Sequence, residues 1–105
     1  MAVATANTRT AAQALAALGQ PSRLGALQVL AGAAPGGVGF AEMAMALGVT
    51  QASLSKHLRV LEAEGLIVRR QDGAAVVYAA RAEGLAGLEK ILADVSRALR
   101  VPAHR

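Results

Sequence analysis

Residues 39–65 read GFAEMAMALGVTQASLSKHLRVLEAEG, a pattern typical of two short helices joined by a tight turn. We expect the first helix over residues 41–47. Gly48 follows it, and glycine adopts a left-handed backbone conformation at little cost. Thr50 is well placed to cap a second helix, because its hydroxyl can accept a hydrogen bond from a free amide of the first turn. The segment therefore predicts a helix, a glycine turn and another helix.

The second of these helices has two different faces. Leu54, Leu58 and Leu61 are spaced i, i+4 and i+7, so they form one buried stripe. The start and outer side of the helix carry small, polar or cationic residues, as expected of a helix that enters a DNA major groove. The alternative interpretation is an ordinary helical hairpin whose polar face contacts only solvent. The candidate DNA contacts here are Thr50, Gln51, Ala52, Ser53, Ser55, Lys56, His57 and Arg59.

Short hydrogen-bonding side chains near the helix start are candidates for reading base edges. Gln51 could pair with adenine through two hydrogen bonds, and Ser53 and Ser55 could contact bases. An alternative role for Ser53 is to reinforce the cap at Thr50. This region is therefore where we expect sequence selectivity to arise.

The cations further along the helix have a different expected role. Lys56 and Arg59 suit phosphate groups, which position a protein on DNA without reading its sequence. His57 lies beside the buried stripe, so we expect a half-buried ring bonded to a backbone group or a phosphate in preference to a metal.

Composition limits the class of protein. The chain has 105 residues, of which 54% are hydrophobic but 2% aromatic, so a small core of leucine, valine and alanine is expected. It has no cysteine, which excludes disulfides, cysteine metal sites and thiol redox sensing within the chain. The net charge of +4 fits an anionic partner. No residue set suggests a catalytic site, a cofactor site or a metal site, so we do not expect an enzyme.

Neither a membrane segment nor a targeting peptide is expected. The longest stretch without charge, residues 24–41, contains Gln28, Pro35 and several glycines. The N-terminus lacks an early positive region, and Arg9 and Thr10 interrupt its apolar residues. The default expectation is a cytoplasmic protein.

Two helices should precede the central motif. After residues 1–7, where no regular structure is expected, a helix over 8–18 would place Ala11, Leu15 and Leu18 on one face and end at Gly19. A second helix over 21–31 would start at Pro21, with Gln20 as a weak cap. Its expected inward residues are Leu24, Leu27, Leu30 and Ala31.

Arg23 stands near the start of that second helix, where a cation opposes the helix dipole. We therefore expect a specific partner for Arg23, such as a carboxylate. The glycine- and proline-rich residues 32–39 should form a loop.

After Gly65 the apolar period changes from 3.6 to 2, which predicts strands over 66–71 and 74–80. Asp72 and Gly73 between them indicate a hairpin turn. With these two as the turn residues, the pairs would be Gln71 with Ala74, Arg69 with Val76, Val68 with Val77 and Ile67 with Tyr78. Arg69 and Arg70 would point to opposite faces and are further candidate DNA contacts.

The last helix is expected over 82–99, with apolar residues at heptad spacing and Ile91 beside them. So wide a stripe leaves apolar surface for a second copy of the chain. Residues 101–105 would form a short basic tail after the helix. The candidate dimer residues are Leu15, Leu85, Leu88, Leu92, Val95 and Leu99.

These elements make a mainly α fold of order α-α-α-α-β-β-α, in which the hairpin follows the helix-turn-helix directly. This is the arrangement of a winged helix-turn-helix, spanning residues 8–100. The hairpin can lie along the duplex beside the groove that the helix enters. The combination indicates double-stranded DNA as the partner more specifically than either part alone.

The residues resemble the ArsR/SmtB family of bacterial repressors. The resemblance rests on LGQPSR (18–23), LGVTQASLSKHL (47–58), LEAEGLIV (61–68), Gly73 and Tyr78. It implies a homodimer formed by the first and last helices, which represses transcription at a palindromic operator and is released by an effector. The resemblance also makes the chain's own promoter the first place to look for that operator.

The chain departs from the family pattern at its sensing sites. It lacks the cysteines of the metalloid sensors, its last helix has no histidine, and His104 lies beyond Pro102. Ala74 stands where family members often carry a cation. The open signals are a small organic ligand, a metal bound by carboxylates and His104, or none. Two other functions stay open: a winged helix that binds a protein, and a DNA-binding protein without sequence preference.

Overall fold

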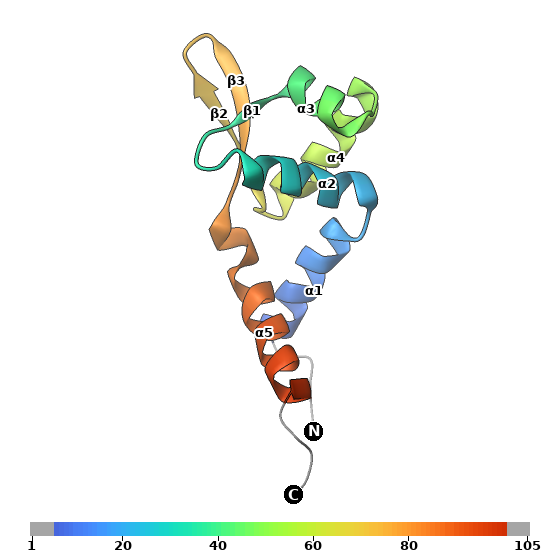
Figure 1. Cartoon of the computed structure of the whole chain (residues 1–105), viewed down its shortest axis with the longest axis vertical. Coiled ribbons are helices and arrows are strands. Elements are labelled where there is room, and N and C mark those ends of the chain that lie inside the picture. Colours follow the sequence, from blue (N-terminus) through green and yellow to red (C-terminus); the bar gives the residue numbers. More distant parts are fainter. Residues whose placement is uncertain (1–5, 101–105) are drawn as a thin grey trace, which may run out of the picture.

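The computed structural model describes residues 6–100 (Figure 1). Residues 21–80 form a rounded head, and the helices at residues 6–18 and 86–100 form two arms that project from it. The molecule is elongated, with extents of 60 × 24 × 24 Å. The fold is the expected mainly helical winged helix-turn-helix. Its elements in chain order are α1 (Ala6–Leu18), α2 (Pro21–Gly32), β1 (Val38–Gly39), α3 (Phe40–Leu47), α4 (Gln51–Ala63), β2 (Ile67–Asp72), β3 (Ala75–Ala80), the 3₁₀ turn η1 (Ala82–Leu85) and α5 (Ala86–Arg100).

Most element boundaries agree with the sequence-based expectations within one or two residues. Helix α1 begins at Ala6, two residues before the expected start, and the expectations for residues 1–5 and 101–105 lie outside the described residues. The last helix is divided, because a 3₁₀ turn precedes α5. Segment 32–39 is not wholly a loop, since its end contributes the short strand β1.

The strands form one antiparallel sheet of order β1-β3-β2. The predicted hairpin register is wrong by two residues: Ile67 pairs with Ala80, Arg69 with Tyr78 and Asp72 with Ala75. Gly73 therefore takes the first turn position, with φ +62°. Hairpin turns of two residues need a positive φ at that position, and glycine meets the need without strain.

The hydrophobic core lies in the head and extends into the start of the arms. Its largest fully buried side chains are Leu30, Met43, Leu54, Leu58, Leu61 and Leu66. The expected inward face of α2 is half right. Leu27 and Leu30 are buried, but Leu24 is 46% exposed and Ala31 is exposed, while Ala26 is fully buried in their place. Apolar residues surround this helix, so their spacing does not define a single stripe.

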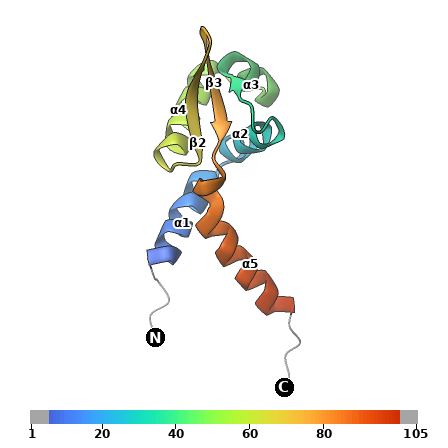
Figure 2. The same ribbon diagram turned by 90° about the vertical axis from the view of Figure 1, so that its left-hand side faces the viewer.

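Helix α1 packs through alanines. Ala11, Ala14 and Ala17 are buried and Leu18 is half-buried, whereas Leu15 is 48% exposed, so Leu15 is not part of the inward face. Small residues let a helix approach its neighbours closely. Helix α1 contacts α5, and Figure 2 shows the two helices diverging below the head.

Candidate nucleic-acid interface

The turn between α3 and α4 has the geometry that the sequence predicts. Gly48 adopts a left-handed conformation (φ +65°, ψ +34°), and the amide of Val49 donates to the carbonyl of Ala44 at 3.2 Å. The hydroxyl of Thr50 accepts a hydrogen bond from the amide of Ser53 at 3.1 Å, which confirms Thr50 as the N-cap of α4. A hydroxyl that accepts in this way still has its own proton to donate.

Helix α4 separates its faces as expected. Leu54, Leu58 and Leu61 are at most 1% exposed, which confirms the buried stripe. Among the candidate DNA contacts, Ser53, Ser55 and His57 are half-buried, and the exposed residues are Thr50, Gln51, Ala52, Lys56 and Arg59. The start and outer side of α4 therefore present polar and cationic groups to solvent.

Three cations of α4 and the hairpin differ in their pairing from two cations of α5. Lys56, Arg59 and Arg69 are exposed, and within residues 6–100 none of the three has a hydrogen-bond or ion-pair partner. In α5, by contrast, Asp94 accepts from Lys90 at 3.4 Å and from Arg97 at 3.0 Å. Unpaired cations on α4 and the hairpin remain available for an anionic partner.

The two arginines of the hairpin lie in different surroundings. Arg69 pairs with Tyr78 in the sheet, and its guanidinium has no hydrogen-bond or ion-pair partner within residues 6–100. Nη2 of Arg70, by contrast, donates to the carbonyl of Pro35 at 3.1 Å. The prediction that they point to opposite faces agrees with their adjacent positions in β2. Sequence reasoning missed the contact with Pro35, because nothing local links residues 35 positions apart.

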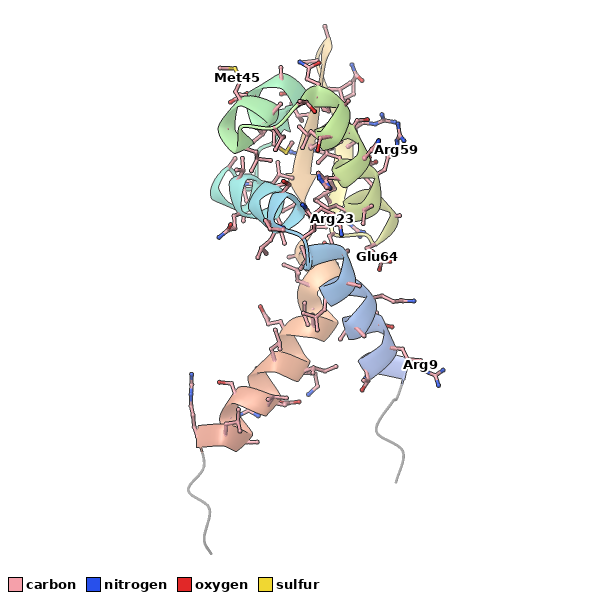
Figure 3. All side chains as sticks on the ribbon, turned by 90° about the vertical axis from the view of Figure 1, so that its right-hand side faces the viewer. Arg9, Arg23, Met45, Arg59 and Glu64 are labelled. Carbon is pink, nitrogen blue, oxygen red and sulfur yellow. The ribbon has the colours of Figure 1, made fainter. Side chains whose placement is uncertain are left out.

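The partner expected for Arg23 is not a carboxylate. Its Nε donates to the carbonyl of Ala17, near the end of α1, and its Nη1 lies 3.4 Å from Nδ1 of His57. The side chain of Gln20 caps α2 by accepting from the Arg23 amide at 3.0 Å, which confirms the expected cap. His57 therefore contacts an arginine side chain, which the sequence did not predict. Figure 3 shows Arg23 at the junction of the head and α1.

The arms expose much of the predicted dimer surface. Leu92, Val95 and Leu99 are 51%, 50% and 81% exposed, and Leu15 on α1 is similarly accessible. Leu88 is buried and Leu85 half-buried within the protomer. A hollow of about 420 Å³ on α5 is lined by Leu85, Leu88, Glu89, Leu92 and Ala93.

Residues 6–100 contain neither a cluster of metal ligands nor a membrane-spanning helix. There, no three histidine, aspartate or glutamate side chains come together as metal ligands would. No helix in the same range is long and apolar enough to cross a membrane. The exposed polar groups of α4 and the hairpin remain the candidate site of the head.

A helix-turn-helix with a hairpin wing and free cations on both elements defines the class of winged-helix DNA-binding proteins. A sequence model described as MarR family matches residues 20–75, just over half of the chain, and these residues contain the whole helix-turn-helix, the first strand of the hairpin and its turn. The chain belongs to this family of winged-helix proteins and, by its whole-chain structural relatives, it is an ArsR-family DNA-binding transcriptional regulator.

The structural relatives cover the arms as well as the head. An ArsR-like transcriptional regulator from Rhodococcus sp. RHA1 is 27% identical with a TM-score of 0.70, covering 90% of this chain and 91% of its own. The transcriptional repressor BigR from Xylella fastidiosa is 26% identical with a TM-score of 0.65, and 88% of each chain is covered. MepR from S. aureus, solved with DNA, shares the fold at 22% identity and a TM-score of 0.63, covering 88% of this chain and 77% of its own. No curated protein matches the sequence. The Rhodococcus protein and BigR are named as a transcriptional regulator and a transcriptional repressor, and neither name denotes an enzyme.

Proposed function

We propose that this protein is a sequence-specific repressor that binds a palindromic operator as a homodimer. An effector that is not sensed through cysteine would release it. The observation that carries the proposal is the pairing pattern of the cations: Lys56 and Arg59 of α4 and Arg69 of β2 are exposed and have no partner within residues 6–100, whereas Lys90 and Arg97 of α5 are paired with Asp94. The start of α4 would enter the major groove, and the hairpin would lie beside it on the backbone.

The exposure of each residue and its position along α4 indicate whether it would contact a base or a phosphate. Gln51 is exposed at the first turn of α4, where a recognition helix contacts bases, so we assign it to base reading together with Ser53 and Ser55. Lys56 and Arg59, one and two turns further along, would bind phosphate, with Thr50 and Ala52 beside the DNA backbone. His57 faces Arg23, so we assign it no direct contact with DNA. Arg69 and Arg70 would bind phosphate from the wing.

The arms support a homodimer. Leu15, Leu92, Val95 and Leu99 expose large apolar side chains on two helices that project from the head. The hollow beside Leu92 can accept a side chain from a partner helix, and water would leave this surface on association. A two-fold dimer presents two α4 helices, and a palindrome presents two equivalent half-sites.

Repression is supported by the relatives. BigR is named as a transcriptional repressor, and MepR was solved bound to DNA with the same fold. For this chain the effector must act without thiol chemistry, since the sequence contains no cysteine.

The test is fluorescence anisotropy with the protein's own upstream DNA and with scrambled DNA of equal length, at low and physiological salt, with and without a chelator. A cognate preference of about 10³-fold that the chelator leaves unchanged is the expected result. Weak, equal binding to both duplexes would overturn the proposal. In that case, a steep loss with salt would favour DNA binding without sequence preference, and no binding would favour a protein partner.

A further inference from the structure

One arginine joins three helices at the base of the head. Arg23 belongs to the first turn of α2 and is half-buried. Its Nε donates to the carbonyl of Ala17 in the last turn of α1, and its Nη1 faces Nδ1 of His57 on α4 at 3.4 Å. The side chain thus links the arm helix α1 directly to the recognition helix.

The direction of this side chain has an electrostatic cause. A cation at the start of α2 is unfavourable beside that helix's own positive end. The last four carbonyls of α1 lack partners within their helix and form its negative end. Turning toward Ala17 moves the guanidinium to the favourable pole of a different helix. The unfavourable electrostatic interaction of the guanidinium with the start of α2 is offset by its favourable interaction with the end of α1.

The fork of the guanidinium allows the second contact. Arginine presents several N–H donors in one rigid plane, so one group can donate in two directions, whereas lysine has a single point of charge. All N–H groups of the guanidinium are donors, so the contact requires Nδ1 of His57 to act as acceptor, with the ring proton on Nε2. His57 is thereby held on the side of α4 that faces α1 and α2.

We propose that Arg23 is a positioning residue that fixes α4 relative to α1 through His57, and so sets the spacing and orientation of the two recognition helices in the dimer. The proposal rests on the proposed function, because spacing matters only when two half-sites are bound together. Half-sites of such dimers lie about one helical turn apart, roughly 34 Å, so a small rotation of each head moves α4 out of register.

The experiment compares Arg23→Lys, His57→Leu and His57→Asn on two duplexes: the operator and the same DNA with one half-site scrambled. Asparagine places an amide oxygen close to the position of Nδ1, whereas leucine fills the space without an acceptor. Arg59→Ala, a change in a proposed phosphate contact, is the matched control, and it should weaken binding to both duplexes by the same factor.

The variants should weaken binding to the operator, which has two half-sites, more than binding to the duplex with one half-site scrambled. Arg23→Lys and His57→Leu should each lower operator affinity roughly tenfold but half-site affinity by less than about threefold. His57→Asn should recover most of the affinity that His57→Leu loses. The double variant Arg23→Lys/His57→Leu should be little worse than either single variant, because both changes remove one contact.

Three results would overturn the role of Arg23. Equal losses on the two duplexes would mean that His57 contacts DNA or that the head is damaged. Additive losses in the double variant would show that the two residues act separately, and failure of asparagine to recover affinity would exclude the acceptor role. If circular dichroism shows that Arg23→Lys does not fold, the comparison of His57→Leu with His57→Asn still tests the proposal, because both of these variants retain Arg23. Wild-type protein that failed to distinguish operator from scrambled DNA would instead overturn the proposed function and this role with it.

Discussion

Nη2 of Arg70 donates a hydrogen bond to the carbonyl oxygen of Pro35 at 3.1 Å, which ties the hairpin to the loop between α2 and β1. Its neighbour Arg69 has no such partner within the described chain. The two wing arginines are therefore unequal, although the sequence presents them as equivalent.

This inequality predicts different effects on DNA binding. Arg69→Ala should weaken binding to cognate and random DNA alike and reduce the slope of log K against log salt by about one, because one phosphate contact is lost. Arg70→Ala should have the smaller effect on the slope, since part of its guanidinium is already engaged. Anisotropy titrations over a series of salt concentrations measure both quantities. A larger slope change for Arg70→Ala would reverse the assignment.

Base reading and phosphate binding on α4 should separate by mutation. Ser55→Ala should lower affinity for the operator by about 1–3 kcal/mol and leave random DNA nearly unchanged, which relaxes specificity. Arg59→Ala should lower affinity for both DNAs equally. The measurement is the ratio of operator to random affinity for each variant. Were both variants to lose equally on both DNAs, this assignment of roles would fail.

The sequence predicted the elements with strong local signals. The stripe of Leu54, Leu58 and Leu61 and the cap at Thr50 follow from periodicity and hydrogen bonding within a few residues, and both are confirmed. The hairpin was predicted correctly, but its predicted register was wrong by two residues, because Gly73 rather than Asp72 takes the first turn position with its positive φ.

Contacts between distant segments could not be predicted. Arg23 carried a signal, an unfavourable position at a helix start, yet its partners come from the end of α1 and from α4. The exposure of Leu24 shows the same limit. Since α2 is apolar on several sides, tertiary packing rather than spacing decides which side is buried.

The ion pairs of α5 predict a small dependence of stability on pH. Hydrogen bonds from Arg97, then from Lys90, lower the pKa of Asp94 below its usual value of 3.8. A lowered folded-state pKa contributes stability above the unfolded value, and that contribution is lost as the pH falls through the folded value. Asp94→Asn should therefore melt slightly below wild type at neutral pH. The two melting curves, followed by circular dichroism, should coincide in acid below the folded pKa, and a constant difference at every pH would exclude this cause.

Two glycines near the start of the last helix should respond oppositely to alanine. A Cβ on Gly84 would collide with the carbonyl oxygen of Gly65 and lie 2.9 Å from Cα of Leu66, so Gly84→Ala should cost about 1–3 kcal/mol. A Cβ on Gly87 meets nothing within 4 Å, and Gly87→Ala should stabilise α5 by about 0.5–1 kcal/mol. Thermal melts at one fixed protein concentration give both changes. A change of melting temperature in the same direction for both variants would contradict the packing of η1 on residues 65–66, which follow α4.

The apolar surface of α5 predicts that association and operator binding fail together. Leu92→Glu combined with Val95→Glu would place charges on the proposed interface, where they would lose their water on association. Sedimentation velocity should show a monomer at concentrations where wild type is a dimer. Operator affinity should fall by about 10² or more, because binding two half-sites through one linked body is lost.

Arg97→Glu is the matched control for that variant, because it places the same acidic side chain on the charged side of α5, where Asp94 and Lys90 lie. It should leave the dimer intact. Binding of the double variant to a single half-site should change little, since α4 and the wing are untouched and the head keeps its own core. A double variant that stays dimeric would place the interface elsewhere on the molecule, and one that loses half-site binding as well would show that α5 supports the head itself rather than the association of two copies.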